Sequence, residues 1–170
     1  EAEAAQAAGA EGIGLFRTEF LFMDRSTMPS EEEQTAAYLE VSEQMAGKEV
    51  IIRTLDIGGD KAVPYLQMGA EDNPFLGYRA IRYCLDHSEI FQIQLRALLR
   101  AGAKYRNIKI MLPLITSVEE VRAAKALLAA CKKQLADEGI AFDDGMQVGV
   151  MIETPAAVMI ADWLAREVDF

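Results

Sequence analysis

The hydrophobic positions of the chain follow two different periods. Four short apolar runs, each bounded by polar or glycine-containing segments, are typical of buried strands; they cover residues 12–20, 48–55, 108–115 and 147–152. Between them, apolar residues recur at every third or fourth position, which is typical of helices with one buried face. The clearest such stripe comprises Val118, Val121, Leu127, Leu128, Cys131 and Leu135. The pattern therefore predicts strands that alternate with amphipathic helices.

Capping sequences mark where two of the predicted helices begin. Ser30 with Glu33, and Ser117 with Glu120, have the spacing of capping boxes. Thr154 and Pro155 suit the first turn of a helix that follows the fourth strand. Beyond the helix expected from residue 117, the predicted helices cover residues 1–10, 30–45, 73–85, 90–101 and 156–165, with a restart at 86–89 and a glycine-rich loop over 56–73.

Near-continuous apolar strands that alternate with helices indicate a parallel sheet covered by helices. A barrel of eight such units needs about 250 residues, whereas this chain has 170 and four predicted strands. It opens on a helix, and residues 167–170 are typical of the start of a fifth strand. We therefore expect an α/β fold, a partial (β/α)8 TIM barrel, with residues 1–170 as one domain truncated at both ends. A self-contained open sheet is the alternative.

Composition narrows the possible partners. Hydrophobic residues make up 51% of the chain and the formal net charge is −10, which disfavours nucleic acid or an anionic membrane surface as a partner. No apolar run reaches the length of a membrane span, and no secretory signal opens the chain. Cys84 and Cys131 lack metal-ligand spacing and are expected to be buried thiols. This cysteine usage fits the cytoplasm.

Charged residues stand at the ends of three predicted strands. Arg17 and Arg53 lie near the carboxyl ends of two of the runs, and Glu153 follows the fourth. Active sites of parallel α/β folds lie at the carboxyl ends of the strands. A guanidinium group donates two hydrogen bonds to phosphate, and a carboxylate among arginines either pairs with one of them or binds Mg²⁺. A salt bridge is the alternative for each residue alone, but three equivalent positions favour a site for an anionic, metal-bridged ligand.

Two further features are less specific. Arg79 lies one turn into the helix predicted from residue 73, where an arginine near a helix N-terminus favours an anion. From the residues alone, however, Arg79 and Arg82 are better interpreted as surface charges. Residues 58–61, Gly-Gly-Asp-Lys, lack the spacing of a phosphate-binding P-loop and are expected to form a tight turn.

Four ordered motifs resemble a known family. They are Gly-Ile-Gly-Leu-Phe-Arg-Thr-Glu-Phe-Leu-Phe-Met (12–23), Arg-Thr-Leu-Asp-Ile-Gly-Gly-Asp-Lys (53–61), Asn-Pro-Phe-Leu-Gly-Tyr-Arg-Ala-Ile-Arg (73–82) and Val-Met-Ile-Glu-Thr-Pro-Ala-Ala (150–157). Together they resemble Enzyme I of the bacterial phosphotransferase system, the phosphoenolpyruvate–protein phosphotransferases, from about residue 8 onwards. Pyruvate phosphate dikinase and phosphoenolpyruvate synthase share the first and last motifs in looser form and remain an alternative. A non-catalytic folding or association module is another.

The resemblance implies a fold, a reaction and partners. The C-terminal domain of that family is a (β/α)8 barrel that binds phosphoenolpyruvate and Mg²⁺ and forms a homodimer. The phosphoryl group passes to a histidine on a separate domain and then to the histidine-containing phosphocarrier protein for sugar uptake. By motif match, Arg17, Arg53 and Arg79 would bind the phosphate, and Glu153 would be one of two Mg²⁺ ligands.

Other parts of the family's machinery have no match in the chain. The second metal ligand lies in a Gly-Thr-Asn-Asp motif, and the barrel cysteine lies in a Met-Cys-Gly context, neither of which occurs here. Neither Cys84 nor Cys131 takes over that role, and His87 does not match the phosphohistidine, so it is interpreted as a helix-junction residue. No catalytic residue is therefore assigned, and we expect the isolated chain to be inactive.

Overall fold

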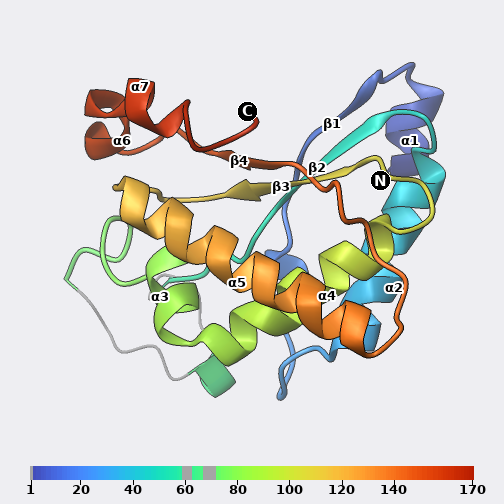
Figure 1. Ribbon diagram of the computed structural model, residues 1–170, viewed down its shortest axis with the longest axis horizontal. Coiled ribbons are helices and arrows are strands. Elements are labelled where there is room, and N and C mark those ends of the chain that lie inside the picture. The colour runs from blue at the N-terminus through green and yellow to red at the C-terminus, as the bar shows by residue number, and fades with distance from the viewer. Residues whose placement is uncertain (1, 59–62, 67–71) are drawn as a thin grey trace.

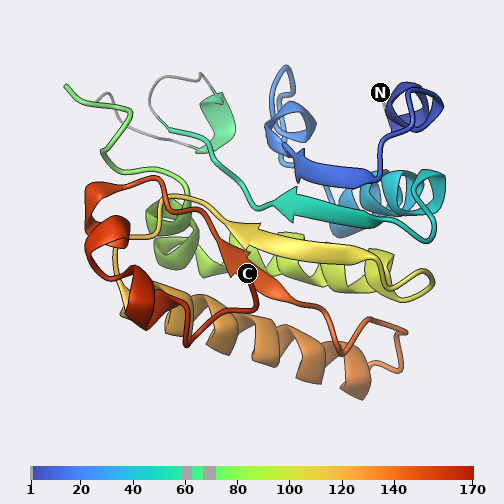
Figure 2. The ribbon, with the colours of Figure 1, turned by 90° about the horizontal axis from the view of Figure 1, so that it is seen from above.

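Parallel strands form the centre of the protein. The computed structural model describes residues 2–58, 63–66 and 72–170. Its sheet has the order β1 (Gly12–Phe16), β2 (Glu49–Arg53), β3 (Ile108–Leu112) and β4 (Val148–Val150). Figure 2 shows these strands side by side and pointing the same way. The predicted α/β fold is confirmed, and the arrangement is consistent with part of a (β/α)8 barrel.

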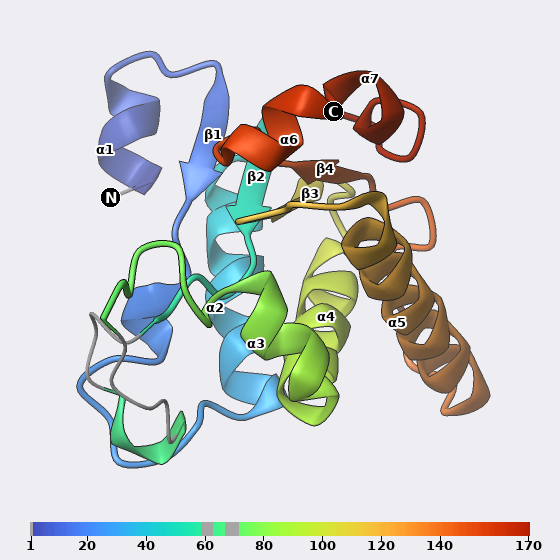
Figure 3. The ribbon, with the colours of Figure 1, turned by 90° about the vertical axis from the view of Figure 1, so that its left-hand side faces the viewer.

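Helices connect the strands and cover the sheet. The three longest are α2 (Glu31–Gln44), α4 (Ser88–Gly102) and α5 (Val118–Asp137), which pack against one another in that order. They lie together on one side of the sheet (Figures 1 and 3). The shorter elements are α1 (Ala2–Ala7), η1 (Glu19–Leu21), η2 (Pro64–Leu66), α3 (Ile81–Asp86), α6 (Pro155–Met159) and α7 (Ala161–Leu164). Within the described residues, no helix combines the length and apolar character that crossing a bilayer requires.

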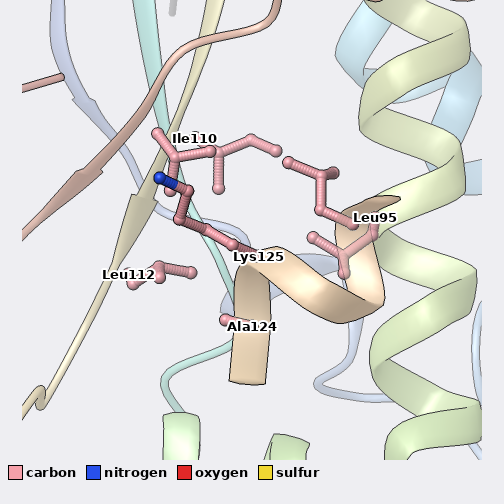
Figure 4. Close-up of a pocket in the computed structure, with 7 residues that line it drawn as sticks. Leu95, Ile110, Leu112, Ala124 and Lys125 are labelled. Carbon is pink, nitrogen blue, oxygen red and sulfur yellow. The ribbon is translucent and has the colours of Figure 1, made fainter. Parts of the chain in front are cut away.

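The core lies between the sheet and the three long helices. Ile52 on β2 and Ile110 on β3 are fully buried and belong to one cluster with Leu95 and Leu98 of α4. A cavity of about 10 Å³ remains beside β3, where Leu95, Ile110, Leu112, Ala124 and Lys125 lie around it (Figure 4). Because a single water needs about 10–15 Å³, this cavity is too small for a ligand larger than one water.

Both predicted capping boxes are present. The Ser30 hydroxyl accepts a hydrogen bond from the Glu33 amide at 3.1 Å, and the Glu33 carboxylate accepts one from the Ser30 amide at 2.7 Å. Ser117 and Glu120 make the same pair of contacts at 3.2 and 3.1 Å. These bonds satisfy amides that a helix leaves without an internal partner, which explains why α2 and α5 begin where the sequence predicts.

The helix predicted over residues 73–85 is largely wrong. Residues 72–78 form bends and turns, and α3 begins only at Ile81. Ala80 has a positive φ of 51°, and its amide donates to the carbonyl of Ile57 at 3.2 Å instead of to a helical partner. This left-handed conformation interrupts a helix. A tertiary contact to the segment after β2 therefore overrides the local helical pattern.

Other boundaries differ by a few residues. The first strand ends at Phe16 and not at residue 20, and the last predicted helix is divided at Ile160 into α6 and α7. Residues 59–62 and 67–71, which include the predicted turn at Gly59, Asp60 and Lys61, lie outside the described residues.

The C-terminal residues lie along β4 (Figures 1 and 2), but residues 168–170, where the sequence predicts the start of a further strand, have no regular secondary structure. The Asp169 amide donates to the Val148 carbonyl at 2.8 Å, and the Val150 amide donates to the Phe170 carbonyl at 3.1 Å. The ring of Phe170 lies directly over Gly149, where a Cβ would approach it to 2.4 Å. A glycine is therefore required at this point of β4.

Candidate functional site

The predicted site residues lie at one edge of the sheet. Arg17 directly follows β1, Arg53 ends β2, and Glu153 comes three residues after β4. Because all four strands are parallel, their carboxyl ends share this edge, where α/β folds place their active sites. Arg79 reaches it from the turn before α3.

Asp56 joins two of the predicted arginines. One carboxylate oxygen, Oδ2, lies 3.0 Å from Nη1 of Arg53. The other, Oδ1, accepts hydrogen bonds from Nε of Arg79 at 3.1 Å and from Nη2 at 2.9 Å. A single carboxylate therefore fixes the distance between Arg53 and Arg79, which lie 26 residues apart in the chain.

Arg53 also contacts the segments that follow β1 and β4. Its Nη2 donates to Oε1 of Glu19, after β1, at 2.8 Å. Its Nη1 lies 3.9 Å from the sulfur of Met151, after β4. Its Nε is buried, and among the described residues it has no hydrogen-bond partner. Arg53 therefore connects three segments of the site, and its Nε–H group lacks an acceptor among the described residues.

The site is buried and nearly balanced in charge. Arg53 is 8% exposed, Arg79 6%, Asp56 8% and Glu19 5%. Two guanidinium groups thus face two carboxylates in a region of low solvent access. Buried charges persist only when they are paired and hydrogen-bonded. The carboxylates therefore hold the guanidinium groups in place before any ligand arrives.

Arg17 differs from the other two arginines. Its side chain is exposed, and within the part of the chain that the structure describes it forms no hydrogen bond or ion pair. The structure thus brings Arg53 and Arg79 together but does not bring Arg17 into contact with them. Arg17 is a positive charge at the same edge that no described residue neutralises, so it is available to an anion.

Glu153 is held by the loop after β3. Its Oε1 accepts a hydrogen bond from the Leu114 amide at 2.7 Å, and Leu114 has a positive φ of 54°. Beside it, the Thr154 hydroxyl donates to the Ile115 carbonyl at 2.8 Å and caps α6 through the Ala157 amide at 3.1 Å. The carboxylate is exposed, so its second oxygen remains open to solvent.

The residues available to a metal ion are few. Across residues 2–58, 63–66 and 72–170 there is no group of three or more His, Cys, Asp or Glu side chains that could hold one. Glu153 by itself offers one hard oxygen ligand. Mg²⁺ commonly binds through one or two carboxylates together with oxygens of a phosphorylated ligand, so a single carboxylate here fits such a shared site and not an all-protein cage.

Sequence reasoning missed two residues of this site. Asp56 lies three residues after Arg53, and Glu19 lies two residues after Arg17. The acidic residue three positions after Arg53 was a usable signal for Asp56, because a buried arginine needs a counter-charge. Glu19 had no such signal, since it pairs with Arg53 on the neighbouring strand and not with Arg17. The interpretation of Arg79 as a surface charge is wrong, since it is buried against Asp56.

Residues outside the site behave largely as expected. Arg82 is partly buried and donates to the Gly77 carbonyl at 2.6 Å. His87 lies at the junction of α3 and α4 and stacks on the ring of Tyr83 with centroids 4.0 Å apart. Burial raises the pKa of Cys84 to about 12 and that of Cys131 to about 11, as predicted for buried thiols.

Comparisons with known proteins give matches over the whole or nearly the whole chain. The family model described as "PEP-utilising enzyme, PEP-binding domain" matches residues 1–170. The chain is 57% identical over 170 residues to phosphoenolpyruvate-protein phosphotransferase of Geobacillus stearothermophilus, covering 100% of this chain and 29% of that protein. The same coverage holds for the Haemophilus influenzae protein of that name, at 55% identity. That of Bacillus subtilis (strain 168) is 56% identical over 162 residues, or 95% of this chain and 28% of its own length.

Proposed function

Because the chain belongs to the family of PEP-utilising enzymes defined by their PEP-binding domain, we propose that it carries the phosphoenolpyruvate site of a phosphoenolpyruvate–protein phosphotransferase. The chain spans about 29% of the length of the curated relatives that it matches. We propose that it works as part of a longer protein, within a C-terminal barrel domain. We also propose that these 170 residues alone do not catalyse phosphate transfer from phosphoenolpyruvate.

The observation that carries the proposal is the cluster of Arg53, Asp56 and Arg79 at the carboxyl edge of the sheet. Two guanidinium groups are held side by side by one carboxylate, and Arg17 lies at the same edge with no counter-charge among the described residues. Planar guanidinium groups match the oxygens of a phosphate. This arrangement supports a phosphorylated anion as the ligand.

The arginines have a physical role in the proposed reaction. Phosphoryl transfer depends on positioning and on neutralising charge at the transferred oxygens. Arg17, Arg53 and Arg79 bind the phosphate and stabilise that charge, while Glu19 and Asp56 orient Arg53. Because the two buried arginines are already fixed by ion pairs, they need little rearrangement when the ligand binds.

Mg²⁺ is the proposed cofactor, and Glu153 is its ligand in this chain. The second oxygen of the Glu153 carboxylate is not engaged by the Leu114 amide and is free to bind the ion. When bound, Mg²⁺ supplies further neutralisation of the phosphate charge. Glu153 holds its oxygen at the carboxyl edge of the sheet, on the segment that Thr154 anchors.

We propose the partners of the family for the longer protein. They are phosphoenolpyruvate, a histidine-containing phosphocarrier protein and a second copy of the same protein, in the cytoplasm. The relatives are named phosphoenolpyruvate-protein phosphotransferase. This name supports phosphoenolpyruvate as the substrate and a protein as the phosphate acceptor.

A labelling experiment tests the proposed function. The longer protein is incubated with Mg²⁺, phosphoenolpyruvate carrying ³²P and the histidine-containing carrier, and the proteins are separated on a gel. We expect label first on the protein itself and then on the carrier, with none after removal of the metal by a chelator. Label that moves to a nucleotide instead of a protein would support a dikinase or synthase.

A further inference from the structure

Gln94 is a buried polar residue on a helix face that is otherwise apolar. It lies on α4 and is 1% exposed, and its buried neighbours Phe91, Leu95 and Leu98 on that helix are all apolar. Burying an amide costs free energy unless all of its hydrogen bonds are made. An apolar side chain here would avoid that cost, so the presence of Gln94 requires an explanation.

The hydrogen bonds of Gln94 reach the segments that carry the site. Its Oε1 accepts from the Leu55 amide at 2.9 Å, and Leu55 lies between Arg53 and Asp56. Its Nε2 donates to the Thr18 hydroxyl at 3.3 Å, and Thr18 directly follows Arg17. One side chain on α4 therefore holds the end of β1 and the end of β2.

A second bond closes the connection between these two strand ends. The Thr18 hydroxyl, which accepts from Gln94, donates to the carbonyl of Arg53 at 3.0 Å. Thr18 is fully buried. The backbone that carries Arg53 is thus fixed from α4 through Leu55 and from β1 through Thr18.

Tyr38 completes the network from α2. The other amide proton of Gln94 goes to the Tyr38 hydroxyl at 3.1 Å, and that hydroxyl donates to Gln34 at 3.1 Å. Burial raises the pKa of Tyr38 well above its usual range, so the phenol stays neutral. The amide of Gln94 therefore has its oxygen and both of its protons satisfied, which fixes its orientation.

We propose that Gln94 is a positioning residue for phosphoenolpyruvate binding: through Leu55 and Thr18 it sets where Arg17 stands relative to Arg53 and Asp56. This inference rests on the proposed function. None of the four family-like motifs contains Gln94, since it lies between the third and the fourth. Misplacement of a binding group by about 1 Å is enough to reduce catalysis strongly.

The test uses the longer protein with Gln94→Leu, Thr18→Val and Thr18→Ser. Gln94→Leu removes the bonds from this side chain to Leu55, Thr18 and Tyr38. Thr18→Val removes the bond to the Arg53 carbonyl and the acceptor of one Gln94 proton, but keeps the bonds to Leu55 and Tyr38. We expect Gln94→Leu and Thr18→Val each to raise the KM for phosphoenolpyruvate about tenfold. A change of this size corresponds to the loss of roughly one net hydrogen bond. Thr18→Ser keeps the hydroxyl and should restore a KM near that of the wild type.

Gln92→Leu is the matched control. Gln92 lies on the same helix, is partly buried, and its side chain bonds to Gln134 on α5 at 3.4 Å, away from the site. All variants are assayed at a temperature at which circular dichroism shows them folded. A purely structural role would lower the melting temperature of Gln94→Leu and leave the KM unchanged, which would overturn the proposal.

The outcomes separate this inference from the proposed function. If the wild-type protein does not transfer phosphate from phosphoenolpyruvate, the proposed function fails. If the wild type does so but Thr18→Val and Gln94→Leu both keep its KM, the function stands and the positioning role fails. Equal effects in Thr18→Val and Thr18→Ser would also contradict the role of the hydroxyl.

Discussion

At the scale of single residues, the site depends on how Arg53 is held. Its guanidinium group contacts Glu19, Asp56 and Met151 from the segments after β1, β2 and β4. Its planar fork lets it contact several neighbours at fixed angles, which the single ammonium group of a lysine cannot do. The planar shape and several donors of the guanidinium group, and not only its charge, therefore determine these contacts.

Arg53→Lys tests this conclusion. In the longer protein we expect the fold to be retained and phosphate transfer from phosphoenolpyruvate to fall about 10²-fold or more, because the donors that we propose to bind the phosphate are lost. Steady-state kinetics of carrier phosphorylation measure the change. Arg122→Lys is the control, since Arg122 also binds a carboxylate, Glu167, but on the exposed surface. An unchanged rate for Arg53→Lys would remove Arg53 from the phosphate site.

Asp56→Asn tests how much the shared carboxylate contributes to the stability of the fold. The substitution leaves Arg53 and Arg79 without their shared carboxylate, and breaking a buried pair costs about 3 kcal/mol or more. Urea unfolding should reveal that loss. Asp137→Asn, which removes an exposed partner of Lys133, should change the free energy of unfolding by less than about 0.5 kcal/mol. Equal losses of unfolding free energy in the two variants would show that Asp56 contributes no more to stability than an exposed carboxylate.

The two thiols give a prediction about pH. Because burial raises the pKa of Cys84 to about 12 and that of Cys131 to about 11, both remain protonated in the folded state when an unfolded chain would already lose the protons. The stability that they contribute is therefore complete below about pH 8.5 and falls as the pH rises towards 11 and 12. A thiol reagent at pH 8 should label the folded chain far more slowly than the chain in denaturant. Rapid labelling of either cysteine in the folded chain would contradict their burial.

At the scale of elements, the helices are fixed to one another by charge as well as by packing. Arg96 on α4 binds Glu31 on α2 at 2.6 Å and Glu138, at the end of α5, at 2.7 Å. Arg100, one turn further along α4, binds the same Glu31. These ion pairs lie away from the site edge, so they orient α2, α4 and α5 without competing with the arginines at the strand ends.

The start of α5 is the clearest test at this scale. Ser117→Ala removes the hydroxyl that accepts the Glu120 amide, which should lower the free energy of unfolding by about 1 kcal/mol. Chemical denaturation measures it. Ser26→Ala, at an exposed position in a bend, should have no measurable effect. A neutral result for Ser117→Ala would mean that the Ser117 hydroxyl does not contribute to the stability of α5.

At the scale of the whole molecule, the sheet has a face that the long helices do not cover. Leu15 on β1 is 42% exposed, and Phe20, shortly after that strand, is 59% exposed. β1 is the first strand in the order of the sheet. An exposed strand edge with apolar side chains promotes association with other chains.

We therefore expect the isolated 170-residue chain to associate as its concentration rises. Light scattering should show an increasing mean mass, and Leu15→Lys should reduce it, because a charge on the edge strand opposes pairing. Thr27→Lys, an exposed loop substitution with the same change in charge, should reduce it much less. A chain that remains monomeric at high concentration would contradict the prediction.

The sequence by itself determined the order and type of most elements. Period, caps and strand composition are local properties, so the parallel sheet, both capping boxes, and Arg17, Arg53 and Glu153 at its carboxyl edge were predictable. The motifs added Arg79 as a site residue. The failure over residues 73–85 was not a failure of the local pattern, because the turn is imposed by a distant contact of Ala80 with Ile57.

Only the tertiary structure decided which charges meet. That Asp56 binds both Arg53 and Arg79, that Glu19 holds Arg53, and that Gln94 reaches Thr18 and Leu55 all depend on segments brought together by the sheet and α4. The physical reason is burial. A buried charge or amide must find its partner wherever the fold supplies one, and no local spacing in the sequence records that choice.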